Sequence, residues 1–76
     1  PNYMTALTLN GDASLVAMGD TNGQITIWNA ANGTSLFSFQ GYSDAVRQLL
    51  FSRDGRLLIG LGSEDGIATI RIWVVN

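Results

Sequence analysis

One stretch of this sequence occurs twice. The residues from Met4 to Trp28 align with those from Val46 to Trp73 once three extra residues are allowed in the second copy. The two copies are 42 positions apart at their start and 45 positions apart at their tryptophans. A repeat of this length indicates a chain built from similar supersecondary units, each of which needs a neighbour to bury its apolar face.

Each repeat is expected to consist of short strands. Apolar and polar residues alternate with a period near two, as in Ile25–Trp28 and Thr69–Trp73, and no segment has the helical period. Asn-Gly and Asp-Gly pairs separate these runs, and they tolerate the positive φ that tight antiparallel turns require. The pattern predicts an all-β antiparallel meander of about seven strands. We expect them at residues 3–9, 15–18, 24–28, 35–39, 45–51, 57–61 and 69–74.

Four strands in a repeat of roughly 40–45 residues are typical of a β-propeller blade. We therefore expect two blades: residues 1–44 form the first with the linking outer strand, and residues 45–76 form a second that lacks its outer strand. Propellers have about 4–8 blades, so two do not close a ring. Further blades, identical copies or a partner must cover the open faces. The missing initiator methionine favours a part excised from a longer protein.

The residues that punctuate each repeat resemble the WD-repeat family of β-propellers. Residues 46–56 resemble the opening strand and turn of a WD repeat, and residues 63–73 resemble its later turn and third strand. Residues 28–33 and 39–42 fit the passage from one repeat to the next. The resemblance assigns a structural role to these signature residues: Trp28, Gly41, Asp54, Gly55, Asp65, Gly66 and Trp73.

The sequence departs from the family at a hydrogen-bonded tetrad that many members build from histidine, aspartate, Ser or Thr, and tryptophan. Tyr42 occupies the histidine position, and Asn22 replaces the aspartate of the first turn. The residues that match are Asp65, Trp28 and Trp73. We therefore expect apolar packing to hold the blades together. We also expect the three inserted residues, one near Leu61 and two at 67–68, to form a bulge beside the turn.

Composition excludes several kinds of site. The chain has no cysteine and no histidine, so it lacks the usual zinc ligands and the base of the familiar nucleophilic triads. Four arginines against six acidic residues give a net charge of −2 and form no basic tract, which argues against nucleic acid as a partner. No apolar run approaches the roughly 20 residues of a membrane span. We expect no cofactor and no metal, and the absence of cysteine favours a cytoplasmic location.

Several short motifs have both a chemical and a structural interpretation. Acidic residues in turns could act as acid and base, but aspartate also caps turns. Gly60-Leu61-Gly62 resembles a phosphate loop without the helix that such loops need. Asp20-Thr21-Asn22-Gly23 resembles part of a calcium loop without the remaining ligands. In these cases the structural interpretation is the better one. Asn32-Gly33-Thr34 is a glycosylation sequon if the protein is secreted, and a turn explains it at least as well.

The loops remain the candidate binding surface. In a blade, the turns that follow the second and the outer strand emerge on one rim, and the family resemblance implies that proteins or peptides bind there. The candidate partner-binding residues are Tyr42, Asp44, Arg47, Asp20 and Glu64. Tyr42 has the area and polar tip of an interface anchor, although support of its own turn explains it equally well. We expect a non-catalytic interaction scaffold, or else accessory blades of a larger enzyme or signalling protein.

Overall fold

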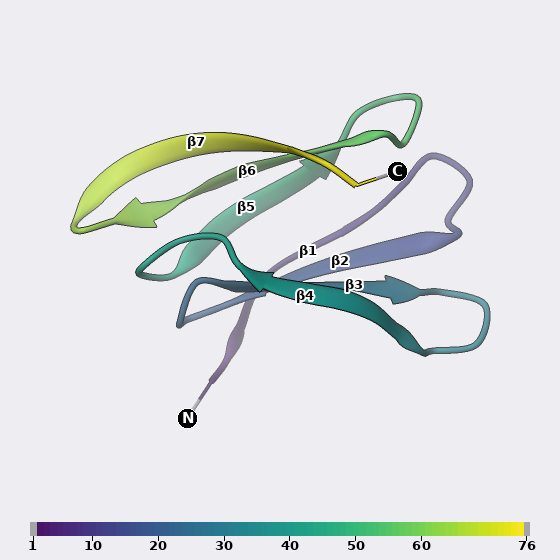
Figure 1. Cartoon of the computed structure of the whole chain (residues 1–76), viewed down its shortest axis with the longest axis horizontal. Coiled ribbons are helices and arrows are strands. Elements are labelled where there is room, and N and C mark those ends of the chain that lie inside the picture. Colours follow the sequence, from purple (N-terminus) through teal and green to yellow (C-terminus); the bar gives the residue numbers. More distant parts are fainter. Residues whose placement is uncertain (1, 76) are drawn as a thin grey trace.

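The computed structural model describes residues 2–75, which form seven β-strands in two layers (Figure 1). The strands are β1 (Met4–Leu9), β2 (Leu15–Asp20), β3 (Gln24–Asn29), β4 (Ser35–Gln40), β5 (Val46–Phe51), β6 (Leu57–Glu64) and β7 (Ile67–Val74). They make two antiparallel sheets, β1-β2-β3-β4 and β5-β6-β7. The predicted all-β meander is confirmed. The described residues contain no helix able to cross a membrane.

The two sheets repeat each other pair for pair. Between the first and second strand of each sheet, every pair in one sheet corresponds to a pair 42 positions later in the other. Leu7 faces Met18 in the first sheet, for example, and Leu49 faces Gly60 in the second. Each of these pairings also carries a bulge at the corresponding point, near the start of the first strand. The register therefore defines which residues of the two sheets are equivalent.

The inserted residues lengthen the central hairpin of the second sheet. β6 and β7 have 8 residues each, whereas β2 and β3 have 6 each. The added pairs run from Gly62–Thr69 to Glu64–Ile67 without a break in register. The predicted bulge beside this turn is therefore wrong. Asp65 (φ 51°) and Gly66 (φ 80°) close the hairpin with a two-residue turn. The residues on either side of this turn then pair, Glu64 with Ile67 and Ser63 with Ala68.

The core lies between the two sheets. It comprises alternate residues of the facing strands and one residue of the connecting loop: Ala17, Ile25, Ile27, Tyr42, Val46, Leu49, Phe51 and Leu58. β1 and β2 lie against β5. A Cβ built on Gly19 would lie 2.6 Å from Val46, so the glycine lets these strands approach closely. The accessible surface of 4615 Å² is near the roughly 4,500 Å² expected of a compact protein of this mass.

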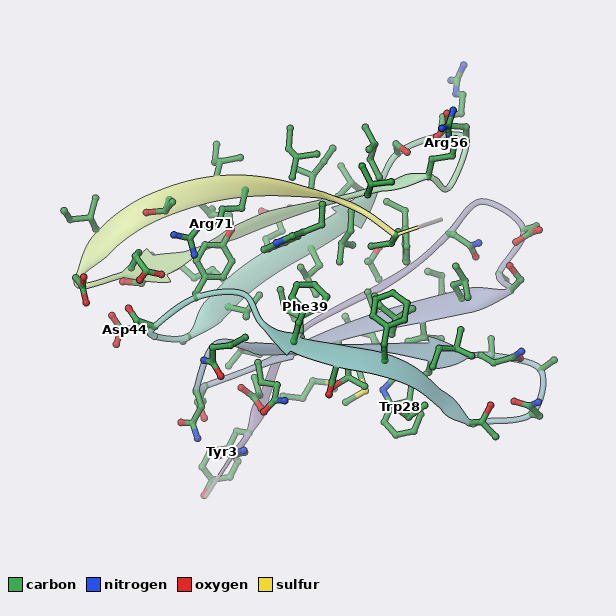
Figure 2. All side chains as sticks on the ribbon, viewed as in Figure 1. Tyr3, Trp28, Phe39, Asp44, Arg56 and Arg71 are labelled. Carbon is green, nitrogen blue, oxygen red and sulfur yellow. The ribbon has the colours of Figure 1, made fainter. Side chains whose placement is uncertain are left out.

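The two tryptophans occupy equivalent positions in different surroundings. Trp73 packs between the sheets, with its ring 5.2 Å from that of Phe39 in an edge-to-face contact. Trp28 points away from the second sheet, whereas Phe39 points toward it (Figure 2). Since each sheet has the same register, the outer face of the first sheet corresponds to the buried face of the second. β7 is the open edge of its sheet, as expected of a blade without an outer strand.

Candidate functional site

Three connections gather at one end of the two sheets, on the left in Figure 1. We call them, together with the side chain of Arg71 that contacts them, the rim: residues 20–24 between β2 and β3, 41–45 between β4 and β5, and 64–67 at the β6–β7 turn. Asp44 lies at this end of the molecule and Arg56 lies at the other (Figure 2). The rim therefore combines the loops in which the sequence placed the candidate binding surface.

Hydrogen bonds fasten the loop at 41–45 to the β6–β7 hairpin. The Ser43 N–H donates to Glu64 Oε1 at 3.0 Å, and the Asp65 N–H donates to Ser43 Oγ at 2.9 Å. The Gly66 N–H donates to Asp44 Oδ2 at 3.2 Å. The Asp44 N–H itself donates to the Ser63 carbonyl at 3.0 Å. Backbone and side chains of both segments thus form one bonded network.

The same loop is also held by the first sheet. The N–H groups of Gly41 and Tyr42 both donate to the Gly23 carbonyl, at 2.9 and 3.2 Å. The Gln40 side chain donates to the Tyr42 carbonyl at 2.7 Å and also to the Asn22 carbonyl. A Cβ on Gly41 would lie 2.5 Å from Ile25 and 3.2 Å from Trp73, so this signature glycine is required by close packing. The loop at 41–45 is therefore bonded to both sheets and bridges them.

Tyr42 fills the space between the sheets below the rim. It is 1% exposed, and its ring meets the Trp73 ring edge to face at 5.8 Å. The ring covers the side-chain position that Gly62 leaves empty, and the Trp73 ring and the Tyr42 hydroxyl cover the one at Gly60. Its hydroxyl has no hydrogen-bond partner among the described residues, and burial raises the pKa of Tyr42. This burial leaves no ring surface for a partner, which corrects the expectation of a surface anchor and favours the alternative of structural support.

Arg71 is a residue of the rim that the sequence analysis missed. Its Nη1 lies 3.0 Å from Glu64 Oε1, and it also donates to the Gly41 carbonyl. The guanidinium carbon lies 5.1 Å from the centre of the Tyr42 ring, within the range of a cation–π contact. Arg71 stands two residues before Trp73 on the same face of β7, which is the one signal in the sequence that could have identified it.

The remaining candidate residues have different surroundings. Asp20 caps its own turn, because its Oδ1 accepts from the N–H groups of Asn22 at 2.9 Å and Gln24 at 3.0 Å. Asp44 and Glu64 lie together with Tyr42 in the bonded network described above. Arg47 is exposed on β5, just beyond the rim, and takes part in no ion pair of the described residues.

The turns at the opposite end have a purely local role. Asp54 Oδ1 accepts from Ser52 Oγ at 2.7 Å and from the Arg56 N–H at 3.1 Å, and the Ser52 bond is the main reason that the pKa of Asp54 is lowered. Gly55 follows with a φ of 74°. Asp12 is capped in the same way by Ser14, which lowers the pKa of Asp12. These residues form turns, as the structural interpretation proposed.

The rim is the acidic end of the molecule. It carries four of the six carboxylates, from Asp20, Asp44, Glu64 and Asp65, and one guanidinium, from Arg71. The opposite end balances Asp12 and Asp54 with Arg53 and Arg56. Within residues 2–75 no three acidic side chains converge as metal ligands would. The rim thus presents an excess of negative charge on loops that hydrogen bonds join to one another.

Comparison with known families and structures agrees with this architecture. The profile of the family described as "WD40: WD domain, G-beta repeat" matches residues 33–73. The β-propeller domain of Cps50 (Swd1) from Myceliophteria thermophila superposes with a TM-score of 0.79 at 22% identity, covering 99% of this chain and 23% of that one. The computationally designed Ika4 protein gives a TM-score of 0.78 at 25% identity, covering 96% of this chain and 41% of the design.

Curated relatives are much longer than this chain. The "WD repeat and SOCS box-containing protein 1" of Danio rerio is 39% identical over 62 residues, which are 82% of this chain and 14% of the relative. "Protein ROOT INITIATION DEFECTIVE 3" of Arabidopsis thaliana is 37% identical over 68 residues, or 90% of this chain and 15% of the relative. The human "Apoptotic protease-activating factor 1" is 41% identical over 59 residues, covering 67% of this chain and 5% of the relative.

Proposed function

The chain belongs to the WD40 repeat family, and we propose that it is a non-catalytic interaction scaffold whose acidic rim binds a basic segment of a partner protein. The observation that carries this proposal is the bonded network of the rim. The loop at 41–45 is held by both sheets, and the carboxylates of Asp44 and Glu64 accept hydrogen bonds within this network. Charge displayed on a rigid frame attracts a partner of opposite charge and fixes its orientation without a large ordering cost.

The same geometry supports binding rather than catalysis. The rim carboxylates are used for structure: Asp20 caps a turn, Asp44 accepts from Gly66, and Glu64 pairs with Arg71. A general base needs a free carboxylate within hydrogen-bond reach of a bound substrate, usually with a perturbed pKa and in a cleft. Because these three carboxylates already bond within the protein, their arrangement favours the recognition of a partner over general-base catalysis.

A titration with a fluorescently labelled peptide rich in Arg and Lys tests the proposal, with an acidic peptide of equal length as reference. Asp44→Asn removes one rim charge and keeps an oxygen that can accept from Gly66. It should weaken binding of the basic peptide up to about fivefold, as a single exposed charge is worth at most roughly 1 kcal/mol. Added salt should weaken binding further.

Asp12→Asn is the matched control, because it removes the same charge from a turn at the opposite end. It should leave the affinity unchanged. Equal losses in Asp44→Asn and Asp12→Asn, or equal affinity for the basic and acidic peptides, would show that the rim does not recognise a basic partner.

Accessory blades in a larger protein are the second candidate function. The names of two relatives refer to something besides repeats: a SOCS box in one and the activation of a protease in the other. In that case the rim network stabilises the parent protein, and the isolated chain should show no preference between the two peptides.

A further inference from the structure

Each sheet of this chain has an apolar face that the other sheet does not cover. On the second sheet, the side chains of Leu50, Ile70, Ile72 and Val74 are between 56% and 75% exposed. On the first sheet, Leu7 and Leu9 are 56% and 54% exposed. Exposed apolar area of this kind on both sides of a small protein marks surfaces of association. We call these the open face of the second sheet and the open face of the first sheet.

The two open faces are the equivalents of the two faces that pack inside the chain. Leu7 and Leu9 correspond to Leu49 and Phe51, which are 5% and 7% exposed in the core. In the same way Ile70 of the open face of the second sheet corresponds to Ile25, which is fully buried. The open face of the first sheet therefore has the apolar pattern of the inner face of the second sheet, and the open face of the second sheet has that of the inner face of the first. These two inner faces already pack on each other within the chain.

A hollow lies on the open face of the second sheet. It has a volume of about 240 Å³ and is lined by Gln48, Leu50, Ile59, Gly60, Leu61 and Ile70. The equivalents of Ile59, Leu61 and Ile70 in the first sheet are the buried residues Ala17, Gly19 and Ile25. Two of them, Ala17 and Gly19, are on β2, which lies against β5, and Val46 of β5 contacts Gly19. The equivalent of β5 is β1, so the equivalent occupant of the hollow is a β1 strand with Met4 beside Leu61.

A polar contact between the sheets has a charged equivalent on the open face. The Thr5 hydroxyl donates to the Val46 carbonyl and so joins β1 to β5. The residue equivalent to Thr5 is Arg47, and the residue equivalent to Val46 is Met4. Met4 pairs with Asp20 across the first sheet. A β1 strand placed on the second sheet would bring the Arg47 guanidinium to the Met4 carbonyl and the neighbouring carboxylate of Asp20.

From these equivalences we propose that a second copy of this chain docks with the open face of its first sheet on the open face of the second sheet. The contact is head to tail, so that each copy can receive one neighbour and cover another, and copies can close a ring. Leu61 and Met4 are larger than Gly19 and Val46, so the copies stand further apart at this point than the sheets within a chain. Within the chain, the short side chain of Thr5 reaches the Val46 carbonyl. Between copies, the longer side chain of Arg47 spans the greater distance to the Met4 carbonyl.

The absolute mass of the 76-residue chain, measured by light scattering on a sizing column, is the first test. We expect a discrete oligomer of about two to four copies, which supplies the roughly 4–8 blades of a propeller. Leu7→Lys alters the open face of the first sheet, and Ile70→Lys alters the open face of the second. Either should raise the dissociation constant between copies about thirtyfold or more, with an unchanged circular dichroism spectrum.

Mixing the two variants identifies the geometry. The Leu7→Lys chain retains an intact second sheet and the Ile70→Lys chain retains an intact first sheet, so the mixture has one productive contact and should form a one-to-one dimer. Arg47→Glu should weaken association, and Arg53→Glu at the opposite end should not.

A wild-type chain that is monomeric over the whole concentration range overturns the proposal. So does an oligomer that persists in both variants, or a mixture of the variants that stays monomeric. Peptide binding at the rim uses none of these residues except Asp20, so the Asp44→Asn titration succeeds or fails independently of the oligomeric state.

Discussion

Gly62 is a position at which a single added methyl group would collide with the buried ring of Tyr42. A Cβ at Gly62 would lie 2.5, 2.6 and 2.7 Å from Cδ2, Cγ and Cε2 of Tyr42. The Tyr42 ring is buried, and Trp73 and Arg71 contact it, so it has no free space to move into. Gly62→Ala must therefore displace β6 from the loop at 41–45.

The expected loss of stability follows from two opposing effects. Overpacking of a well-filled core costs about 1–3 kcal/mol, and this ring is constrained enough to place the cost near the upper value. Alanine in a strand recovers roughly 0.5–1 kcal/mol relative to glycine. The net loss is about 2 kcal/mol, out of about 4–11 kcal/mol for a chain of 76 residues.

Urea unfolding at a fixed protein concentration, followed by tryptophan fluorescence, measures this loss. With a slope of about 1 kcal/mol/M, the midpoint should fall by about 2 M. Gly11→Ala is the control, since the nearest atom to its Cβ is the Arg53 carbonyl oxygen at 3.5 Å, and it should change stability by less than about 0.5 kcal/mol.

A double variant tests the cause. Tyr42→Leu shortens the side chain opposite Gly62, so Gly62→Ala should cost at least about 1 kcal/mol less in that background than in the wild type. A Gly62→Ala variant as stable as Gly11→Ala, or a cost unaffected by Tyr42→Leu, would refute the packing argument.

Two further outcomes follow from the hydrogen bonds and their pKa effects. Tyr42→Phe removes a buried hydroxyl without a partner and should stabilise the fold by about 1 kcal/mol in urea unfolding. Burial raises the pKa of Tyr42, so above pH about 10 the unfolded chain ionises its tyrosine more readily than the folded chain does. The wild type should therefore lose stability above this pH more steeply than Tyr42→Phe. The pKa of Asp54 is lowered, chiefly by Ser52, so its contribution is present above pH about 4 and is lost as the pH falls further. Asp54→Asn should flatten the acid side of the stability profile, and a profile identical to the wild type would contradict this role of the Ser52 bond.

The strands and their order could be predicted because their signals are local. Alternating residues define each strand, and Asn-Gly or Asp-Gly pairs reverse the chain between strands. The long hairpin of β6 and β7 could not be predicted from the alignment of the repeats. Its length depends on whether Asp65-Gly66 forms a two-residue turn or a longer one. With the two-residue turn, the inserted residues become part of the paired strands.

The burial of Tyr42 could not be predicted because it depends on residues from a distant strand. Gly60 and Gly62 seemed at most to resemble a phosphate loop, yet Gly62 leaves the space that the tyrosine ring occupies, and Gly60 leaves space for Trp73 and the Tyr42 hydroxyl. Arg71 belongs to the rim because the loop at 41–45 folds back over β7. Both contacts arise from the packing of the two sheets, which sequence periodicity alone does not describe.

The chain passes from one sheet to the other once, through the loop at 41–45. This loop is the covalent connection between the two sheets. At the far end no hydrogen bond among residues 2–75 joins the two sheets, so we expect local opening to begin there before it reaches the loop at 41–45. Amide hydrogens beside the turn at 52–57 should exchange with solvent sooner than those of the rim. We therefore expect a partner bound at the rim to contact the part of the molecule that opens last. Binding there should restrict little additional motion of this protein.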